Sequence, residues 1–329
     1  PKGLLCFLIH ERRRELKVIT KKLRLIEEDT FEHGFRLQWE WAWLITTAFF
    51  LGEVGAGVFL VSLFLYGKIS LACSIVGWII VTAGKNSAHM LYLGRPLRFW
   101  RMIMRPGTSW ITRGFYATIA LMIFGALHIY FSFQGIDSPV CSVITWIAGF
   151  SAFVVMIYDA IVMTYSPSLS LWNNPLLPIL RASYALMGGV TITIFISSLE
   201  AFHGILNLGQ MNILENLERG LIIANLLMII IYVLTMTYST IESRESVLLM
   251  LRDKYPVVFW LGAVFIGLIV IFLIPIVVAT HSLPFLLFVA ICELVGDYCI
   301  LFLLIRSGVY SPLMPHPNID PTLFAKSKV

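Results

Sequence analysis

Residues 256–280 read PVVFWLGAVFIGLIVIFLIPIVVAT, an apolar run without a single charged side chain. A helix that crosses the hydrocarbon core of a bilayer needs about 20 such residues. Seven further stretches of this kind occur, and the sequence therefore predicts an all-α, polytopic membrane protein with eight transmembrane helices. The predicted helices span residues 42–66, 69–90, 115–133, 141–164, 182–206, 218–239, 256–280 and 284–305.

The composition of the whole chain agrees with this class. Of the 329 residues, 58% are hydrophobic and only 13% are charged, whereas a soluble domain carries about 25% charged residues. An ordinary soluble enzyme, a disordered chain and a nucleic-acid binder are thereby excluded. The five cysteines form no Cys-x-x-Cys pair, so we expect no disulfide framework, no zinc site and no iron–sulfur cluster held by this chain alone.

The positive charges predict the orientation in the membrane. Three parts are expected: a charged arm at residues 1–38, a membrane domain at 39–305 and an extended tail at 306–329. With eight helices, 21 of the 24 Lys and Arg residues, Arg181 among them, fall on the side of the two termini, against Lys68 and Arg219 on the other. Lys and Arg are enriched in cytoplasmic loops. We therefore expect a multi-pass protein of the cell membrane whose termini are cytoplasmic.

Several polar side chains interrupt the apolar segments near this side. Lys85 and His89 are four residues apart on the second helix and share a face. Asp159 lies at a similar depth on the fourth helix, so that an ion pair with Lys85 is geometrically possible. Charged groups are costly at membrane depth. The pair could only join helices, or it could be part of a site for a polar headgroup that exchanges protons.

Other intramembrane polar groups lie deeper. Glu293 and Asp297 are four residues apart on the last helix, and Glu53 stands on the first. These carboxyl groups could form a proton path or only hydrogen-bond neighbouring helices. A di-iron site needs two Glu-x-x-His motifs, and only Glu200–His203 is present. His128 and His203 differ in expected depth by about 10 Å, which argues against a bis-histidine haem, and no metal site is predicted.

The connector between the second and third helices is unusually basic. It reads LGRPLRFWR at 93–101 and RPGTSWITRG at 105–114, with five arginines. Fewer arginines would be enough to set the orientation in the membrane. The planar guanidinium group of arginine can bind carboxylates, phosphates or the acidic face of a docked protein through two parallel hydrogen bonds.

This connector resembles that of the NrfD/PsrC family, the quinone-reactive membrane subunits of polysulfide reductase-type complexes. Two further stretches carry the resemblance: WEW at 39–41 with GAG at 55–57, and LWNNPLLP at 171–178. It covers residues 39–305. The resemblance implies two four-helix bundles and a bound menaquinone or ubiquinone, with no haem or iron–sulfur cluster in this chain. It also implies an iron–sulfur subunit with four [4Fe-4S] clusters docked on the connector face, and a molybdenum or tungsten catalytic subunit beyond it.

The resemblance also implies site residues. Tyr158 matches the tyrosine that contacts the quinone, whereas Ile45 and Ala48 stand near the places of the family's asparagine and histidine on the first helix. The candidates for catalysis are Tyr158, His89, Asp159, Lys85 and Glu40; those for cofactor binding are Tyr158, His89, Trp43 and Trp110. The candidates for partner docking are Arg95, Arg98, Arg101 and Arg113, and those for a proton path are Glu53, Glu293 and Asp297.

The expected function is that of a membrane anchor and quinone-binding subunit in an iron–sulfur oxidoreductase, in which it is not the catalytic subunit but holds the quinone redox site. It would exchange electrons between the quinone pool and the docked subunit, with lipid as its other partner and no nucleic acid. Because the connector lies on the basic side, the complex is expected to face the cytoplasm. One alternative is a secondary transporter with its site at Glu53, Glu293 and Asp297. The other is a haem b-type anchor subunit.

Overall fold

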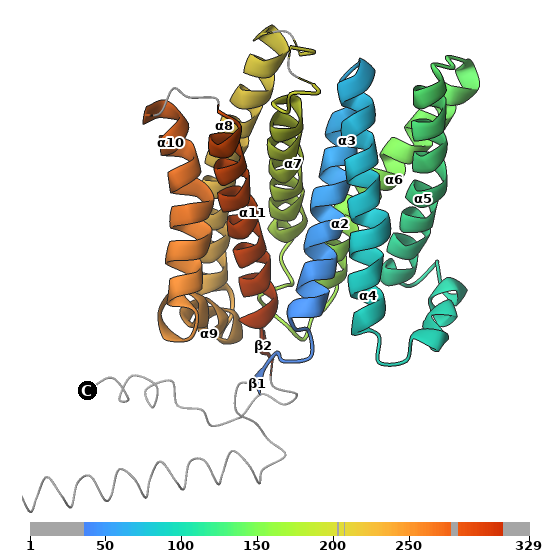
Figure 1. Cartoon of the computed structure of the whole chain (residues 1–329). Coiled ribbons are helices and arrows are strands. Elements are labelled where there is room, and N and C mark those ends of the chain that lie inside the picture. The colour runs from blue at the N-terminus through green and yellow to red at the C-terminus, as the bar shows by residue number, and fades with distance from the viewer. Residues whose placement is uncertain (1–35, 203, 207, 278–281, 312–329) are drawn as a thin grey trace, which may run out of the picture. The chain divides into compact units, whose positions relative to one another are not determined.

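The computed structural model describes residues 36–202, 204–206, 208–277 and 282–311 (Figure 1). Residues Leu37–Val309 form one compact unit, and the rest of the chain forms a second unit of which only Arg36, Tyr310 and Ser311 are described. The predicted arm and tail therefore lie almost wholly outside the described residues.

The described chain is built from helices and two short strands. The spanning helices of the first half are α2 (Trp43–Ser62), α3 (Gly67–Ile79) with the π-helical η1 (Ile80–Lys85) and α4 (Asn86–Tyr92), α5 (Trp110–Gln134) and α6 (Pro139–Thr164). Those of the second half are α7 (Leu176–Ser197), α8 (Leu208–Ser239), the π-helical η4 (Val258–Val270) with α10 (Ile271–Val277), and α11 (Leu283–Arg306). The connecting elements are the 3-10 helix η2 (Pro96–Met104), α9 (Ile241–Leu248) and the π-helical η3 (Leu249–Asp253). Strands β1 (Arg36–Leu37) and β2 (Val309–Tyr310) pair.

The predicted fold class is confirmed: within the described residues the protein is an all-α, polytopic membrane protein. Seven helices are long and apolar enough to cross a membrane there, or eight if a bent pair counts as one span. That pair is Ile241–Asp253 followed by Val258–Ile274, at an angle of 77°. The bend falls at Tyr255-Pro256, and proline disfavours helical backbone at the residue before it.

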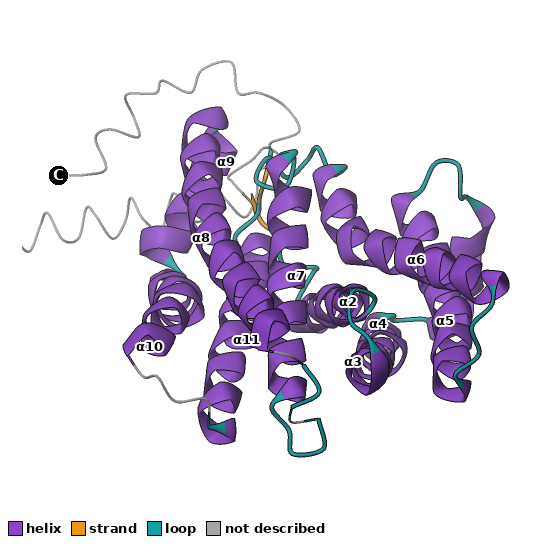
Figure 2. Ribbon diagram, turned by 90° about the horizontal axis from the view of Figure 1, so that it is seen from above, coloured by secondary structure: helices purple, strands orange, loops and turns teal. Residues whose placement is uncertain are grey.

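The spans form two groups of four. α2, α3–α4, α5 and α6 pack on one another, and so do α7, α8, η4–α10 and α11. Seen from above, α5 and α6 lie at one side and α8, α10 and α11 at the other, with α2 between them (Figure 2). The two groups meet where α2 packs against α7. There Gly57 and Gly189 are so close that a β-carbon on Gly189 would lie 2.5 Å from the carbonyl carbon of Gly57.

Three helices have boundaries that differ markedly from the prediction. α7 begins at Leu176 instead of 182, because the Asn174 side chain accepts a hydrogen bond from the Leu176 amide at 2.8 Å. α7 also ends at Ser197 instead of 206, so Glu200 lies in the following loop and is exposed. α5 begins at Trp110, where the Ser109 hydroxyl caps the Thr112 amide. α8 begins at Leu208, ahead of the predicted 218.

Candidate functional site

The first buried polar site lies inside the first group of helices. The Lys85 ammonium donates a hydrogen bond to Asp159 Oδ2 at 3.0 Å, and the exposed fractions of the two side chains are 2% and 0%. The ion pair that depth counting allowed is thus present. Asp159 Oδ1 is also buried and, within the described part of the chain, has no hydrogen-bond partner.

The local backbone explains how Lys85 reaches this position. It ends the π-helical segment η1, and such segments occur mostly as single turns, frequently at functional sites. Its side chain runs over Gly52 of α2, where an added β-carbon would lie 2.5 Å from the Lys85 nitrogen. Any larger residue at position 52 would therefore displace the ammonium from its place between α2 and α6.

Tyr158 and His89 border the same pair. The Lys85 ammonium lies 4.5 Å from the centre of the Tyr158 ring, and that ring packs on Gly114 at the start of α5, where a β-carbon would clash with it. His89 Nδ1 is 3.3 Å from the carbonyl oxygen of Lys85. A carbonyl only accepts, so Nδ1 carries the hydrogen in this contact, and a neutral ring keeps Nε2 as an acceptor.

The other predicted headgroup residues stand apart from this pair. Glu40 is exposed, and the Trp43 side chain is 62% exposed. Trp110 packs on Tyr165 and under Arg113, with centroid distances of 5.7 and 4.5 Å.

The Trp-Glu-Trp stretch has a structural contact instead. The Trp41 ring lies 5.0 Å from that of Trp172, whose indole nitrogen donates to the Leu304 carbonyl oxygen of α11 at 2.6 Å. Two of the stretches that carried the resemblance therefore meet in space, at the end of α11.

A second buried polar site joins the two groups of helices. Arg181 of α7 donates to Glu53 of α2 through Nε, at 3.0 Å, and through Nη2. Its Nη2 also lies 2.8 Å from Asp297 Oδ1 of α11. All three side chains are fully or almost fully buried. We call this set the Arg181 triad.

Sequence reasoning missed Arg181. It was counted as a loop residue because the predicted helix began at 182, and that placement is wrong. A signal was available: Pro175 and Pro178 stand at the helix start, and proline is favoured in the first helical turn. Arg181 then falls inside the helix, where a lone cation demands buried carboxylates.

A third polar group lies further along α7. The Thr191 hydroxyl is 2.7 Å from Glu218 Oε1 of α8 and also bonds Glu293 Oε2 of α11. The carboxyls expected to act together on α11 thus have different partners, since Asp297 belongs to the Arg181 triad. Glu218 and Thr191 were not predicted as site residues. Glu218 was the first residue of its predicted helix, 218–239, and so was not counted among the intramembrane polar groups.

The basic connector contains two kinds of arginine. Arg113 donates to the carbonyl oxygens of Pro106 and Gly107 at 3.0 and 2.7 Å, and so holds the connector's own turn. Arg95, Arg98 and Arg101 are exposed. Of the four predicted docking residues, these three are the ones that present their side chains to solvent.

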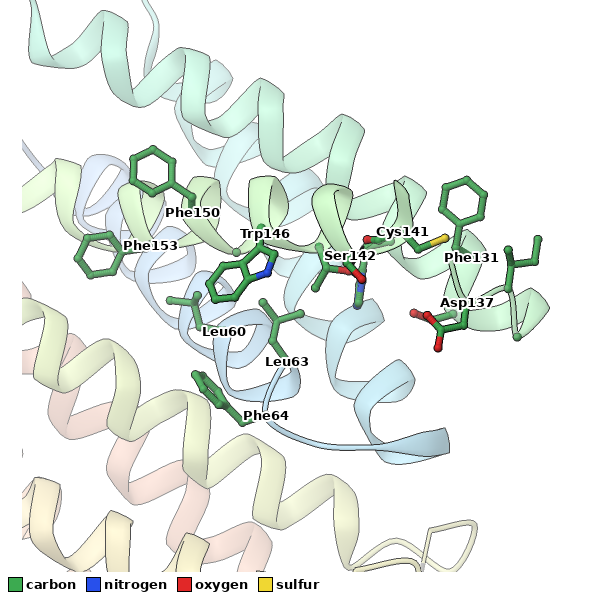
Figure 3. Close-up of a pocket in the computed structure, with 16 residues that line it drawn as sticks. Leu60, Leu63, Phe64, Phe131, Asp137, Cys141, Ser142, Trp146, Phe150 and Phe153 are labelled. Atoms are coloured by element: carbon green, nitrogen blue, oxygen red, sulfur yellow. Dashed lines mark hydrogen bonds between the residues drawn. The ribbon is translucent and has the colours of Figure 1, made fainter. Parts of the chain in front are cut away.

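A pocket of about 790 Å³ lies at the opposite end of the first group of helices (Figure 3). Leu60 of α2, and Leu63 and Phe64 just after it, face Trp146 and Phe150 of α6 across the pocket. All the predicted headgroup residues are described, and none of them lines it. The pocket and the Lys85–Asp159 pair are therefore two different places.

His128 lies in this pocket, and its partner is Thr145 at 2.9 Å. His203, the other histidine of the haem alternative, lies outside the described residues. Among the described residues, no group of three or more His, Cys, Asp or Glu side chains could hold a metal ion.

Comparison with known proteins gives the family. No curated protein matches the chain. Residues 30–312 match the family described as polysulphide reductase, NrfD. This match extends over all the described spans, the connector and both buried ion clusters. The chain is therefore an integral membrane protein that belongs to the NrfD family of membrane subunits of redox complexes.

Proposed function

We propose that this chain exchanges electrons between a membrane quinone, menaquinone or ubiquinone, and an iron–sulfur subunit docked on the connector. The observation that carries the proposal is the buried Lys85–Asp159 pair with Tyr158 packed beside it. Lys85 is seven residues from the end of α4, or about 10 Å along the helix, and the connector follows directly.

The side chains around the pair suit a quinone headgroup. Its two carbonyl oxygens accept hydrogen bonds, and the Tyr158 hydroxyl and the Lys85 ammonium are donors. After reduction, its hydroxyl groups donate, and His89 Nε2 can accept. The unpartnered Asp159 Oδ1 is a further buried acceptor.

Reduction of a quinone takes two protons with two electrons. In the ion pair, Lys85 can donate a proton to a reduced headgroup and Asp159 can accept one from a quinol. Either transfer leaves one charge on the pair, which proton exchange with water must then neutralise. Glu40 is exposed at the start of α2 and is our candidate for exchange with water on that side.

The exposed arginines give the partner surface. Arg95, Arg98 and Arg101 form a positive surface that fits an acidic face of the iron–sulfur subunit. A molybdenum or tungsten catalytic subunit would lie beyond it. The Lys and Arg residues of the connector and of α9–η3 favour a cytoplasmic position for this face. Arg181 no longer counts in this bias, because it is buried.

The decisive experiment compares three variants of the purified complex. Tyr158→Phe and His89→Ala each remove one proposed hydrogen bond to the headgroup. A loss of about 1.4 kcal/mol corresponds to a factor of 10, so quinone-linked electron transfer is expected to fall tenfold or more. His128→Ala, in the pocket at the other end, serves as the matched control and is expected to keep the rate. Unchanged rates in the first two variants with an intact complex would refute the site, and a loss in the control would move it to the pocket.

Purification separates the proposal from its alternatives. Co-purifying brown iron–sulfur polypeptides support it, whereas a stable, colourless protein that purifies alone favours a transporter. A Soret band in the isolated chain would instead favour a haem-bearing anchor.

A further inference from the structure

The Thr191 site contains fewer hydrogens than its contacts need. The Thr191 hydroxyl approaches a carboxyl oxygen of Glu218 and another of Glu293. A hydroxyl has one hydrogen and can donate it to only one of them. The second contact becomes a hydrogen bond only if the other carboxyl carries a proton and donates it to the Thr191 oxygen. The three groups together therefore bind one proton.

The site has an accessible end and a buried end. Glu218 is half-buried. The next residue of α8, Arg219, is 45% exposed and pairs with Glu215 of the same helix at 3.5 Å. Glu293 is fully buried, and its Oε1 has no hydrogen-bond partner among the described residues. Thr191 contacts both carboxyls, and the two carboxyls also interact with each other. Because Thr191 is ten residues beyond Arg181 on α7, it is about 15 Å further from the connector face.

Polar groups continue from this site to the Arg181 triad. Asp297 follows Glu293 by one turn of α11. Tyr184 lies on α7 between Arg181 and Thr191 on the same face, and the Arg181 guanidinium is 5.4 Å from the centre of its ring. The Tyr184 hydroxyl is buried and unpartnered within the described chain. Buried polar atoms of this kind bind ordered water molecules, and such molecules would link the carboxyls.

We propose that Glu218, Thr191 and Glu293 form a proton-exchange site that opens to the membrane face opposite the connector and leads to the Arg181 triad. In the transfer, Glu218 gives its proton to the Thr191 oxygen while Thr191 passes its own hydrogen to Glu293. Glu218 becomes a carboxylate, Glu293 becomes a carboxylic acid and Thr191 stays neutral. The step needs no oxidant or reductant, and it is independent of the quinone reaction proposed above.

The charges around the site favour occupation by a single proton. The described groups that interact with it electrostatically are Glu215 and Arg219 on α8, Asp297 on α11 and Tyr184 on α7. Beyond Asp297 lie Arg181 and Glu53, and Arg181 already pairs with two carboxylates, while Arg219 pairs with Glu215. Among the described residues, two ionised groups at Glu218 and Glu293 would therefore face each other without a cation of their own, which is costly at this depth.

The first test uses infrared difference spectra of the complex in lipid nanodiscs before and after a pH jump. A carboxylic-acid carbonyl band that responds to pH is expected in the parental protein. We expect the band to disappear in Glu218→Gln and in Glu293→Gln, and to shift in Thr191→Val. Thr193→Val is the matched control, because the Thr193 hydroxyl donates to the Gly189 carbonyl oxygen on its own helix at 2.8 Å, and its band should equal the parental one. A band that survives in both glutamine variants would overturn the proposal.

The second test measures the side from which the proton enters. The complex is reconstituted in liposomes in one orientation, the lumen is strongly buffered, and the infrared band is followed after a pH jump outside. The band is expected to respond when the Glu218 end faces outward, to be absent in Glu218→Gln and to equal the parental one in Thr193→Val. A band that responds only when the connector faces outward would contradict the proposal. Neither test involves quinone, so a failure here is distinguishable from a failure of the proposed electron transfer.

Discussion

Two buried ion clusters lie on either side of α2, and consecutive residues of that helix touch them. Gly52 packs against Lys85, which pairs with Asp159. Glu53 pairs with Arg181, which also pairs with Asp297. The first cluster is contained in one group of helices, whereas the second links three helices from both groups.

The two clusters differ in cation and in charge balance. Lysine is a compact point charge on a flexible chain, and arginine is a planar fork that can hold two carboxylates. The Lys85 pair is neutral. Buried oxygens without a hydrogen-bond partner among the described residues occur in both clusters, as Asp159 Oδ1 in the first and as Glu53 Oε1 and Asp297 Oδ2 in the second. With both carboxyls ionised, the Arg181 triad carries one net negative charge, which a single proton neutralises. The difference in charge balance is in keeping with our proposals of ligand binding at the first cluster and of proton binding, beside helix association, at the second.

The largest effect is expected from Arg181→Met, which removes the only cation of the triad. Two carboxyls then remain buried without a partner, and loss of one member of a buried pair costs about 3–5 kcal/mol. The free energy of unfolding in detergent, followed by tryptophan fluorescence, should fall by at least this amount. Adding Glu53→Gln and Asp297→Asn should recover part of it.

Arg219→Met is the matched control for this prediction. Its pair with Glu215 is exposed and four residues apart, and such pairs contribute about 0.3–0.5 kcal/mol. If Arg181→Met destabilised the protein no more than Arg219→Met, the triad would not hold the two groups of helices together.

A smaller loss of stability is expected from Lys85→Met, because it leaves one carboxyl alone instead of two. We expect about 3 kcal/mol. The double variant Lys85→Met with Asp159→Leu removes both charges and should regain most of the stability, while quinone-linked electron transfer stays lost. A double variant that transfers electrons at the parental rate would show that the pair only joins helices.

The contrast between the clusters also shows what the sequence could predict. The Lys85–Asp159 pair could be predicted, because a proline-containing stretch marks the end of each helix, Gly94-Arg-Pro96 after the second and Ser166-Pro167 after the fourth, and depth can be counted inward from it. Arg181 was missed because avoiding a charge in the membrane moved the predicted start of the helix past it, although Pro175 and Pro178 mark an earlier start. Thr191 and Glu218 meet through tertiary packing of α7 on α8, and α8 begins ten residues before the predicted start. Trp43 and Glu40 had the right residue types, but their side chains point to the exterior.

The close approach of α2 and α7 can be tested apart from the charges. In Gly189→Ala, the new β-carbon would lie 2.5 Å from the Gly57 carbonyl carbon, so the helices must separate, at a cost of about 1–3 kcal/mol. Gly220→Ala on α8 is the control, since its β-carbon would meet no atom within 4 Å. We expect Gly189→Ala to lower the unfolding temperature and Gly220→Ala to leave it unchanged or raise it. Equal unfolding temperatures would show that α7 can shift without loss.

The smallest effect concerns the partner surface beside the first cluster. Arg98→Glu reverses an exposed charge of the connector, so the iron–sulfur subunit should bind several-fold more weakly at low salt, with a difference that shrinks as salt screens exposed charges. Arg252→Glu is the matched control, because Arg252 is exposed on η3 in the second half of the chain. Binding measured over a salt series should respond to the first reversal and not to the second. An equal response to both would mean that the iron–sulfur subunit covers both halves of the chain. The position of that subunit would then no longer favour the Lys85 pair over the Arg181 triad as the point of electron exchange.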